Sequence, residues 1–279
     1  MTTTLRPTGP LQHADDGGKS RSYEVCVNSR RVGTIELGTD AGFGHTAGTI
    51  QALSIDEPDR RRGRGTVAAL AAEEVLRGWG CGQVLASVPP DATPALRMLE
   101  SLGYVERSRN MDKAVPSRAP DLPADVEARA MNDAEFAVWE AGTLDAYARN
   151  WMARGVTPEQ ARAKAEASHR ENLPERLATP GVSISVLVHA GTVVGHVWVG
   201  PREVRPGEWG SWVYDVAVSE DQRGKGYGRA LMLLAERAAL ETGDSLLGLH
   251  VFANNTPAIR LYESLHYATT NLNFFKQLL

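Results

Sequence analysis

The strongest constraint on this chain is an internal repeat with an offset of 163 residues. At this offset Glu57 falls on Glu220, and Gly63 falls on Gly226. Over residues 57–113, 19 of the 57 aligned positions are identical without a gap. A solenoid needs at least three stacked repeats. Two copies of this length therefore indicate two related domains, each built from one copy.

The segment between the two copies predicts a linker. Residues 114–124, AVPSRAPDLPA, contain three prolines, which is typical of linkers. We therefore expect a disordered leader over 1–20, a degenerate first domain over 21–113 and a complete domain over 125–279. The second copy is also longer, because residues 127–181 have no counterpart in the first copy.

Hydrophobic patterning in the second copy predicts a mixed α/β fold. The expected helices are 133–153, 157–172, 226–240 and 257–265. The expected strands are 182–188, 193–199, 209–218 and 246–252, followed by an extended stretch over 267–278. We therefore expect two α/β domains, each a mixed and mostly antiparallel sheet flanked by helices, with the N-terminal one truncated.

Composition excludes several classes of protein. The chain is 42% hydrophobic and 23% charged with a net charge of -4, which is globular and lacks the basic character of a nucleic-acid-binding protein. No apolar run reaches the roughly 18 residues of a membrane helix, and the N-terminus has no apolar core like that of a secretory signal. Cys26 and Cys81 lack metal-ligand spacing. We expect a cytoplasmic, bacterial protein without a metal, a membrane or a nucleic acid as partner.

A glycine-rich segment joins a strand to the start of a helix in the second copy. It reads VSEDQRGKGYG over residues 218–228. Glycines leave backbone N–H groups accessible, and a helix N-terminus adds partial positive charge, so the segment is suited to hold a diphosphate. Taken alone, it is equally consistent with a turn that caps a helix.

A second segment, NNTPAIRLYESLHY over residues 254–267, follows after the next strand. The two segments, in this order and at this spacing, resemble the Gcn5-related N-acetyltransferase (GNAT) superfamily. The resemblance covers the whole second copy and most of the first. It implies acetyl-CoA as the cosubstrate and an N-acetyltransferase activity.

The resemblance assigns coenzyme A contacts to the second copy. Backbone amides over 223–229 would hold the pyrophosphate, and the strand that ends at 216–218 would pair with the pantetheine arm. The amide near Val216 would polarise the thioester carbonyl, and Asn255 would contact the pantetheine or the backbone around it. The implied contacts are Val216, Ala217, Val218, Arg223, Gly224, Lys225, Gly226, Tyr227, Gly228, Arg229 and Asn255.

The resemblance also implies a general acid. Tyr262 occupies the position from which family members protonate the departing thiolate. A phenol, with an ordinary pKa near 10, keeps its proton until the thiolate needs it. The alternative is a tyrosine packed in a helix. His266 replaces the usual glycine before the aromatic residue of this motif, which alters a helix C-cap.

The sequence does not fix the general base. Many family members carry Glu or His at the positions of Trp212 and Tyr214, and this chain departs from that pattern. Asp215 is our candidate, although strand alternation points it to the opposite face unless a bulge re-aims it; a structural carboxylate is the alternative. Other candidates are Glu208, His196 and an ordered water chain. For His196 the alternative is a histidine with a structural partner in its strand.

Aromatic residues predict where the acceptor binds. We expect its pocket between the two additional helices and the strands, where His196 and Trp198 share a face. An acceptor with an apolar or ring-bearing body would suit such a pocket, and ordinary core packing is the alternative. Five of the six tryptophans lie in the second copy: Trp139, Trp151, Trp198, Trp209 and Trp212.

The first copy has lost key positions. It keeps the glycines of the loop, but Ala92 stands at the position of Asn255 and Leu99 at that of Tyr262. It also lacks the two additional helices. We therefore expect a structural, non-catalytic domain, with coenzyme A binding as the alternative.

The leading function is acetyl transfer to the primary amine of a small molecule, directly within a ternary complex. The alternatives are a mycothiol-synthase-like enzyme, which also has tandem domains, a protein or peptide acetyltransferase, and a non-catalytic coenzyme A-binding regulatory module. The stretch NLNFFKQLL over 271–279 either completes a sheet or forms the interface edge of a homodimer.

Overall fold

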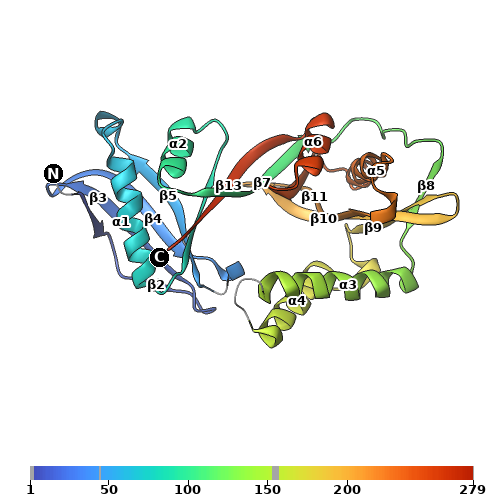
Figure 1. Cartoon of the computed structure of the whole chain (residues 1–279), viewed down its shortest axis with the longest axis horizontal. Helices are drawn as coiled ribbons and strands as arrows, with labels where there is room; N and C mark the ends of the chain where they lie inside the picture. The colour runs from blue at the N-terminus through green and yellow to red at the C-terminus, as the bar shows by residue number, and fades with distance from the viewer. Residues whose placement is uncertain (1–2, 44, 153–156, 279) are drawn as a thin grey trace. The chain divides into compact units, whose positions relative to one another are not determined.

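The computed structural model describes residues 3–43, 45–152 and 157–278, which form two compact units (Figure 1). Unit 1 comprises Met1–Arg109, Phe252–Asn254 and Thr270–Leu279. Unit 2 comprises Asn110–Val251 and Asn255–Thr269. Each unit contains β-strands and α-helices, so the expected α/β class is confirmed.

Unit 1 contains the elements of the first repeat. They are β1 (Thr3–Pro7), β2 (Gln12–His13), β3 (Lys19–Val27), β4 (Arg30–Thr39), β5 (Ala47–Ile55), α1 (Arg64–Gly78), β6 (Gln83–Val88) and α2 (Thr93–Ser101). The strands are ordered β1-β3-β4-β5-β6, and β2 pairs with β3. The expectation of a disordered leader is wrong for β1, because Leu5 packs against the core and Arg6 forms an ion pair with Glu24.

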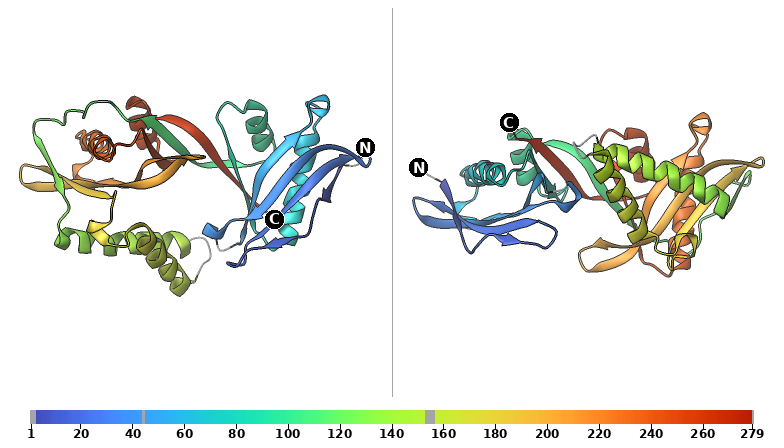
Figure 2. Two further views of the ribbon diagram at one scale, coloured as in Figure 1. Left: turned by 180° about the vertical axis from the view of Figure 1, so that it is seen from behind. Right: turned by 90° about the horizontal axis from the view of Figure 1, so that it is seen from below.

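Unit 2 contains most elements of the second repeat. They are β8 (Val126–Ala130), α3 (Asp133–Met152), α4 (Pro158–Asn172), β9 (Ser183–His189), β10 (Thr192–Arg205), β11 (Glu208–Val218), α5 (Tyr227–Glu241), β12 (Leu246–Phe252) and α6 (Thr256–Ser264). The predicted helices and strands occur in the expected order. In Figures 1 and 2, α5 covers one face of the sheet, and α3 and α4 cover the other.

Strand β8 was not predicted, because its sequence VEARA buries only Val126 and shows no clear alternation. It pairs with β9 as β1 pairs with β3. The segment without a counterpart in the first repeat therefore starts after β8 rather than at residue 127. Among the described residues between β1 and β3 there is no α-helix, so the first repeat lacks α3 and α4 as expected.

Side-chain caps explain where the two additional helices begin. Asn132 accepts a hydrogen bond from the Glu135 amide at 2.9 Å, and Glu135 accepts one from the Asn132 amide at 3.0 Å. This reciprocal pair is a capping box. At the start of α4, the hydroxyl of Thr157 accepts a hydrogen bond from the Gln160 amide. Thr157 is the N-cap of this helix, and a proline follows in the first turn.

The last strands of the two repeats are exchanged between the units. Strand β13 (Ala268–Gln277), from the second repeat, pairs antiparallel with β6, and Phe274 is buried in the core of unit 1. Strand β7 (Val105–Ala114), from the first repeat, neighbours β12, and Met111 is buried in the core of unit 2. The left view of Figure 2 shows the red strand running toward the C-terminus beside the strands of unit 1. Residues 271–277 thus complete a sheet, but it is the sheet of the first repeat.

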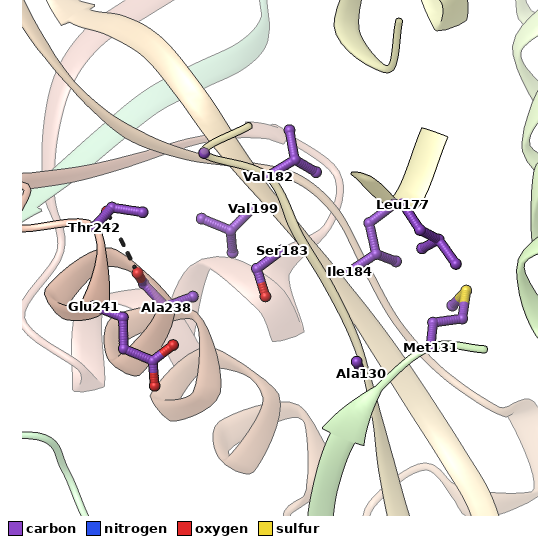
Figure 3. A pocket seen from close by; sticks show the side chains of 11 residues that line it. Ala130, Met131, Leu177, Val182, Ser183, Ile184, Val199, Ala238, Glu241 and Thr242 are labelled. Atoms are coloured by element: carbon purple, nitrogen blue, oxygen red, sulfur yellow. Dashed lines mark hydrogen bonds between the residues drawn. The ribbon is translucent and has the colours of Figure 1, made fainter. Parts of the chain in front are cut away.

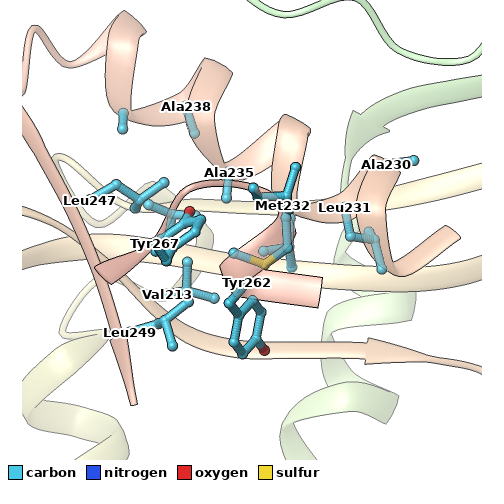
Figure 4. Packing of buried hydrophobic residues seen from close by; sticks show 14 of the residues in the cluster. Val213, Ala230, Leu231, Met232, Ala235, Ala238, Leu247, Leu249, Tyr262 and Tyr267 are labelled. Carbon is cyan, nitrogen blue, oxygen red and sulfur yellow. The ribbon is translucent and has the colours of Figure 1, made fainter. Parts of the chain in front are cut away.

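The core of unit 2 lies between α5 and the sheet (Figure 4). Leu231 and Met232 of α5 pack with Leu247 and Leu249 of β12, all essentially without exposure. Burying side chains of this size contributes roughly 2 kcal/mol each. The same cluster includes Tyr262 of α6, so the core fixes the helix that carries the predicted acid.

Candidate active site

Strands β11 and β12 part halfway along the site. Their parallel pairing covers Ser211–Val213 with Leu247–Leu249. Beyond this last described pair, β11 continues to Val218 and pairs only with β10 on its other edge. The edge of β11 that faces β12 therefore offers backbone groups over residues 216–218. An extended chain can add to such an edge through main-chain hydrogen bonds.

The glycine-rich loop follows directly from this edge. Gly224 and Gly226 have left-handed φ angles of 78° and 86°, a region that favours glycine. Gly226 is the N-cap residue of α5, and no described side chain accepts a hydrogen bond from the first amides of this helix at the cap. The first amides of a helix have no intrahelical partner, so this end of α5 can hold an anion. A Cβ atom at either glycine would meet nothing within 4 Å, which leaves the loop surface open.

Two other predicted contact residues have structural partners. The side-chain oxygen of Asn255 accepts a hydrogen bond from the Ala258 amide at 3.3 Å and caps α6. The guanidinium of Arg229 donates to the hydroxyl of Ser264 and links α5 to α6. Asn255 is thus a helix cap, and any contact with a ligand would be additional.

Tyr262 lies beside the point where the two strands part. Figure 4 shows its ring next to Val213 and Leu249, the last residues of the paired segment. Burial, together with the negative charge of Asp215, raises the pKa of Tyr262 to about 12. The phenol therefore carries its proton throughout the neutral pH range.

A β-bulge brings Asp215 to the face of the sheet covered by α3. Trp198 pairs with Asp215 while Val199 pairs with Val213, so Tyr214 is the extra residue of β11. Tyr214 stacks on Trp198 with ring centroids 4.7 Å apart. Two consecutive side chains thus lie on one face, which simple alternation does not allow. Of the two orientations considered from the sequence, the bulged one is found.

Asp215 accepts two hydrogen bonds on the same oxygen. Nε2 of His196 lies 2.8 Å from Oδ2, and the indole N–H of Trp139 donates to it at 3.1 Å. Burial alone would raise the pKa of Asp215, but the hydrogen bonds of His196, Trp139 and the Val216 backbone amide, together with the charge of His196, outweigh this effect and lower it. Asp215 is therefore a carboxylate at neutral pH.

Helices α3 and α4 bring an aromatic cluster onto this face. The ring of Trp139 lies 5.5 Å from that of His169 and 5.5 Å from that of Trp198. Burial lowers the pKa of His169, which favours its neutral form. Trp139 and Trp198 are only 8% and 6% exposed, so both are core residues, which was the alternative to a pocket lining.

The remaining candidates lie elsewhere or are not described. Glu208 is exposed at the first position of β11, at the opposite end of the strand from residues 216–218. Trp209 is 69% exposed, and Trp212 packs under the guanidinium of Arg202. The side chain of Trp151 lies outside the described residues. No sequence signal pointed to Trp139 as a partner of Asp215, because only tertiary packing brings the two together.

A separate cavity of about 380 Å³ opens in unit 2 near the start of β9 (Figure 3). Met131, Ile184, Val199 and Ala238 are among its lining residues. Its lining includes neither Tyr262 and Asp215 nor the glycine-rich loop. We therefore assign the candidate site to the parting of β11 and β12 and not to this cavity.

Unit 1 repeats the backbone of the site without its side chains. The parallel pairing of β5 with β6 ends at Ile50 and Ala86, at the same repeat positions as in unit 2. Gly63 caps α1 with a left-handed φ of 71°. However, Ala92 provides no side-chain cap for α2, and Leu99 fills the position of Tyr262 in the core.

A family model matches a region in each repeat. The model of the acetyltransferase (GNAT) family matches residues 4–104 and 145–267, one region in each repeat. The chain belongs to the GNAT family. It is an N-acetyltransferase with two GNAT regions, as the two sequence motifs predicted. No helix among the described residues is long and apolar enough to cross a membrane.

Individual relatives show the same relationship. The chain is 30% identical over 150 residues to the uncharacterized N-acetyltransferase YycN of Bacillus subtilis, covering 53% of this chain and 96% of that protein. It is 30% identical over 267 residues to a mycothiol acetyltransferase of Frankia casuarinae, covering 86% of this chain and 72% of that protein. A GCN5-related N-acetyltransferase from Sphaerobacter thermophilus shares the fold, with a TM-score of 0.58 and 19% identity over 92% of this chain and 80% of that one.

Proposed function

We propose that unit 2 transfers an acetyl group from acetyl-CoA to the primary amine of a small molecule, directly within a ternary complex. The observation that carries this proposal is the position of Tyr262 beside the last β11–β12 pair, with Asp215 on the β11 segment just beyond it. An acid and a carboxylate then flank the edge at which a thioester arm can add. Positioning an amine at this point would supply much of the rate.

The proposed coenzyme contacts follow the backbone of unit 2. The β11 edge over 216–218 pairs with the pantetheine arm. The Val216 amide, which acts on the Asp215 carboxylate in the structure, turns to the thioester carbonyl and polarises it. The amides over 223–229 hold the pyrophosphate at the N-terminus of α5. The open surface at Gly224 and Gly226 supports this placement.

The proposed reaction exchanges one bond for another. The amine nitrogen bonds to the acetyl carbon as the carbon–sulfur bond breaks, and the departing thiolate takes the proton of the Tyr262 hydroxyl. The ammonium form of the amine first loses one proton to the pair formed by Asp215 and His196. The nitrogen loses its second proton as the amide forms, and this proton restores the Tyr262 phenol. We expect Tyr262→Phe to lower kcat about 100-fold, within the usual range for a general acid, without changing the affinity for acetyl-CoA.

A second candidate acceptor is suggested by the relative from Frankia casuarinae. That protein is named a mycothiol acetyltransferase, and its match extends over 86% of this chain, which takes in residues of both repeats. Assaying acetyl transfer to the amine precursor of mycothiol, next to a panel of other primary amines, separates this acceptor from the rest.

Calorimetric titration of acetyl-CoA tests whether unit 2 binds the coenzyme at the proposed site. Gly226→Glu should abolish binding, whereas Gly63→Glu is the matched control because both glycines cap a helix with a left-handed φ. We expect one site per chain that only Gly226→Glu removes. Loss of binding in neither variant, or no binding by the wild type, would contradict the proposed site.

A further inference from the structure

The hydrogen bond between Asp215 and His196 defines which nitrogen of the imidazole carries a proton. Asp215 is ionised, so both of its carboxylate oxygens act only as acceptors. Nε2 of His196 lies 2.8 Å from Oδ2 and must therefore be the donor. In the neutral imidazole this leaves the lone pair on Nδ1. Asp215 thus fixes the tautomer of His196, as an orienting carboxylate does for a catalytic histidine.

We propose that His196 is the group that takes the proton of the amine, at Nδ1, and that Asp215 and Trp139 are positioning residues. This inference rests on the proposed acetyl transfer and assigns the base within it. Before the attack, a proton passes from the ammonium group of the acceptor to Nδ1, which leaves a neutral amine and an imidazolium. The imidazolium keeps its Nε2–H bond to the carboxylate and later returns the Nδ1 proton to water.

Trp139 explains why the carboxylate itself is the weaker candidate. Its indole N–H donates to the same Oδ2 atom that accepts from His196. Two donors on one oxygen stabilise the anion and lower its tendency to take a proton. Imidazole, in contrast, is the side chain that most often accepts a proton in general base catalysis. The carboxylate therefore holds the imidazole in place while the imidazole accepts the proton.

The side-chain contacts of His196 lie on two other elements of unit 2, β11 and α3. Asp215 on β11 contacts it directly, and Trp139 on α3 lies with its ring 6.2 Å away. The ring of Trp139 also contacts the ring of His169 on α4. Nε2 of His169 lies 3.6 Å from the carboxylate of Glu140. Burial lowers the pKa of His169, so a variant at His196 is needed to assign an acid limb of the pH–rate profile.

The first test reads the tautomer without any acceptor. Histidine-selective nitrogen NMR on the full chain, assigned with His196→Gln, should show the Nε2–H tautomer for His196. The Asp215→Asn variant should lose this preference, because its amide can also donate. An Nδ1–H tautomer in the wild-type protein would overturn the proposal, whatever the outcome of activity measurements.

The second test follows thiol release from acetyl-CoA with 2-phenylethylamine as the probe amine. His196→Gln should lower kcat about 100-fold and remove the acid limb, while the affinity for acetyl-CoA by calorimetry stays within twofold. Unchanged kcat and an unchanged limb would exclude His196 as the base. Absence of binding in every protein would instead refute the proposed function, so the two failures are distinguishable.

Two matched tryptophan variants test the positioning role. Trp139→Phe removes the N–H donated to Asp215 but keeps the ring, so the imidazolium meets a stronger acceptor and the acid limb should move to higher pH. Trp198→Phe is the control, because Trp198 is similarly buried in the same cluster and its indole nitrogen has no hydrogen-bond partner among the described residues. Equal shifts in both variants would assign Trp139 to packing alone.

Discussion

The ammonium group of Lys113 lies 2.8 Å from the carboxylate of Glu236 in unit 2, although the two residues belong to different repeats. The same contact occurs in unit 1, where Lys276 lies 2.7 Å from Glu73. Lys113 and Lys276 are equivalent repeat positions, and so are Glu73 and Glu236. Each lysine therefore pairs with the glutamate of the other repeat, because the strands that carry the lysines are exchanged.

These ion pairs should be needed for stability. The side chain of Glu73 is only 5% exposed, and removing its partner leaves a nearly buried, unpaired charge, which costs about 3 kcal/mol. We expect Lys276→Met to lower the free energy of unfolding of unit 1 by this amount in chemical denaturation. Adding Glu73→Gln to the same chain should restore most of the loss. A double variant no better than the single one would contradict this account.

The exchange also predicts which unit each strand stabilises. Phe274 is buried in unit 1 and Met111 in unit 2, although Phe274 belongs to the second repeat and Met111 to the first. Phe274→Ala should cost about 3 kcal/mol and increase hydrogen exchange in β6. Met111→Ala should have a similar cost and act in β12. If each variant instead loosened the unit of its own repeat, the strands would not be exchanged in solution.

The C-terminal cap of α6 carries strain that its repeat equivalent avoids. His266 has a φ of 67°, and Gly103 has 81° after α2. A side chain in the left-handed region costs roughly 1 kcal/mol. We expect His266→Gly to stabilise the protein by up to about this amount. Gly103→Ala should destabilise it similarly through the backbone conformation alone, because a Cβ at Gly103 meets nothing within 4 Å. Thermal unfolding of both variants measures the two effects, and a destabilising His266→Gly would assign a packing role to the imidazole.

His169 should make the stability of unit 2 sensitive to acid. Burial lowers the pKa of His169 in the folded protein, so the unfolded state binds its proton more readily. The stabilising contribution is therefore complete above the unfolded pKa of about 6.5 and is lost as the pH falls below it. Denaturation of the wild type between pH 7.5 and 5 should show this loss, and His169→Leu should reduce the slope. His189→Gln, at a side chain 37% exposed, is the control, and an equal slope in wild type and His169→Leu would contradict the prediction.

Local patterns in the sequence were sufficient for most of the fold. Helix α4 begins where a threonine cap and a proline predicted it, and the repeat offset places the glycine loops of both units correctly. The exchange of β7 and β13 could not be predicted in this way. Asn110 and Lys113 match Asn273 and Lys276, so either strand provides the same key side chains to either sheet.

The candidate site could likewise be predicted only in part from local sequence patterns. The glycine loop and the predicted acid Tyr262 lie in continuous segments, so their spacing is enough to propose them as site residues. The environment of Asp215 depends on a bulge at Tyr214 and on the packing of α3, which is 76 residues distant in sequence at Trp139. Neither a register shift nor a contact between a helix and a distant strand leaves a periodic signal in the chain.

The exchange of β13 has a consequence for how the protein is made. Strand β6 of unit 1 pairs with residues 272–277, and the ribosome adds these residues only after it has translated all of unit 2. During synthesis the sheet of unit 1 must therefore wait with the edge of β6 unpaired, while β7 is already available to the strands of unit 2 that emerge after it. The half of the polypeptide that leaves the ribosome first is thus the half that is completed last.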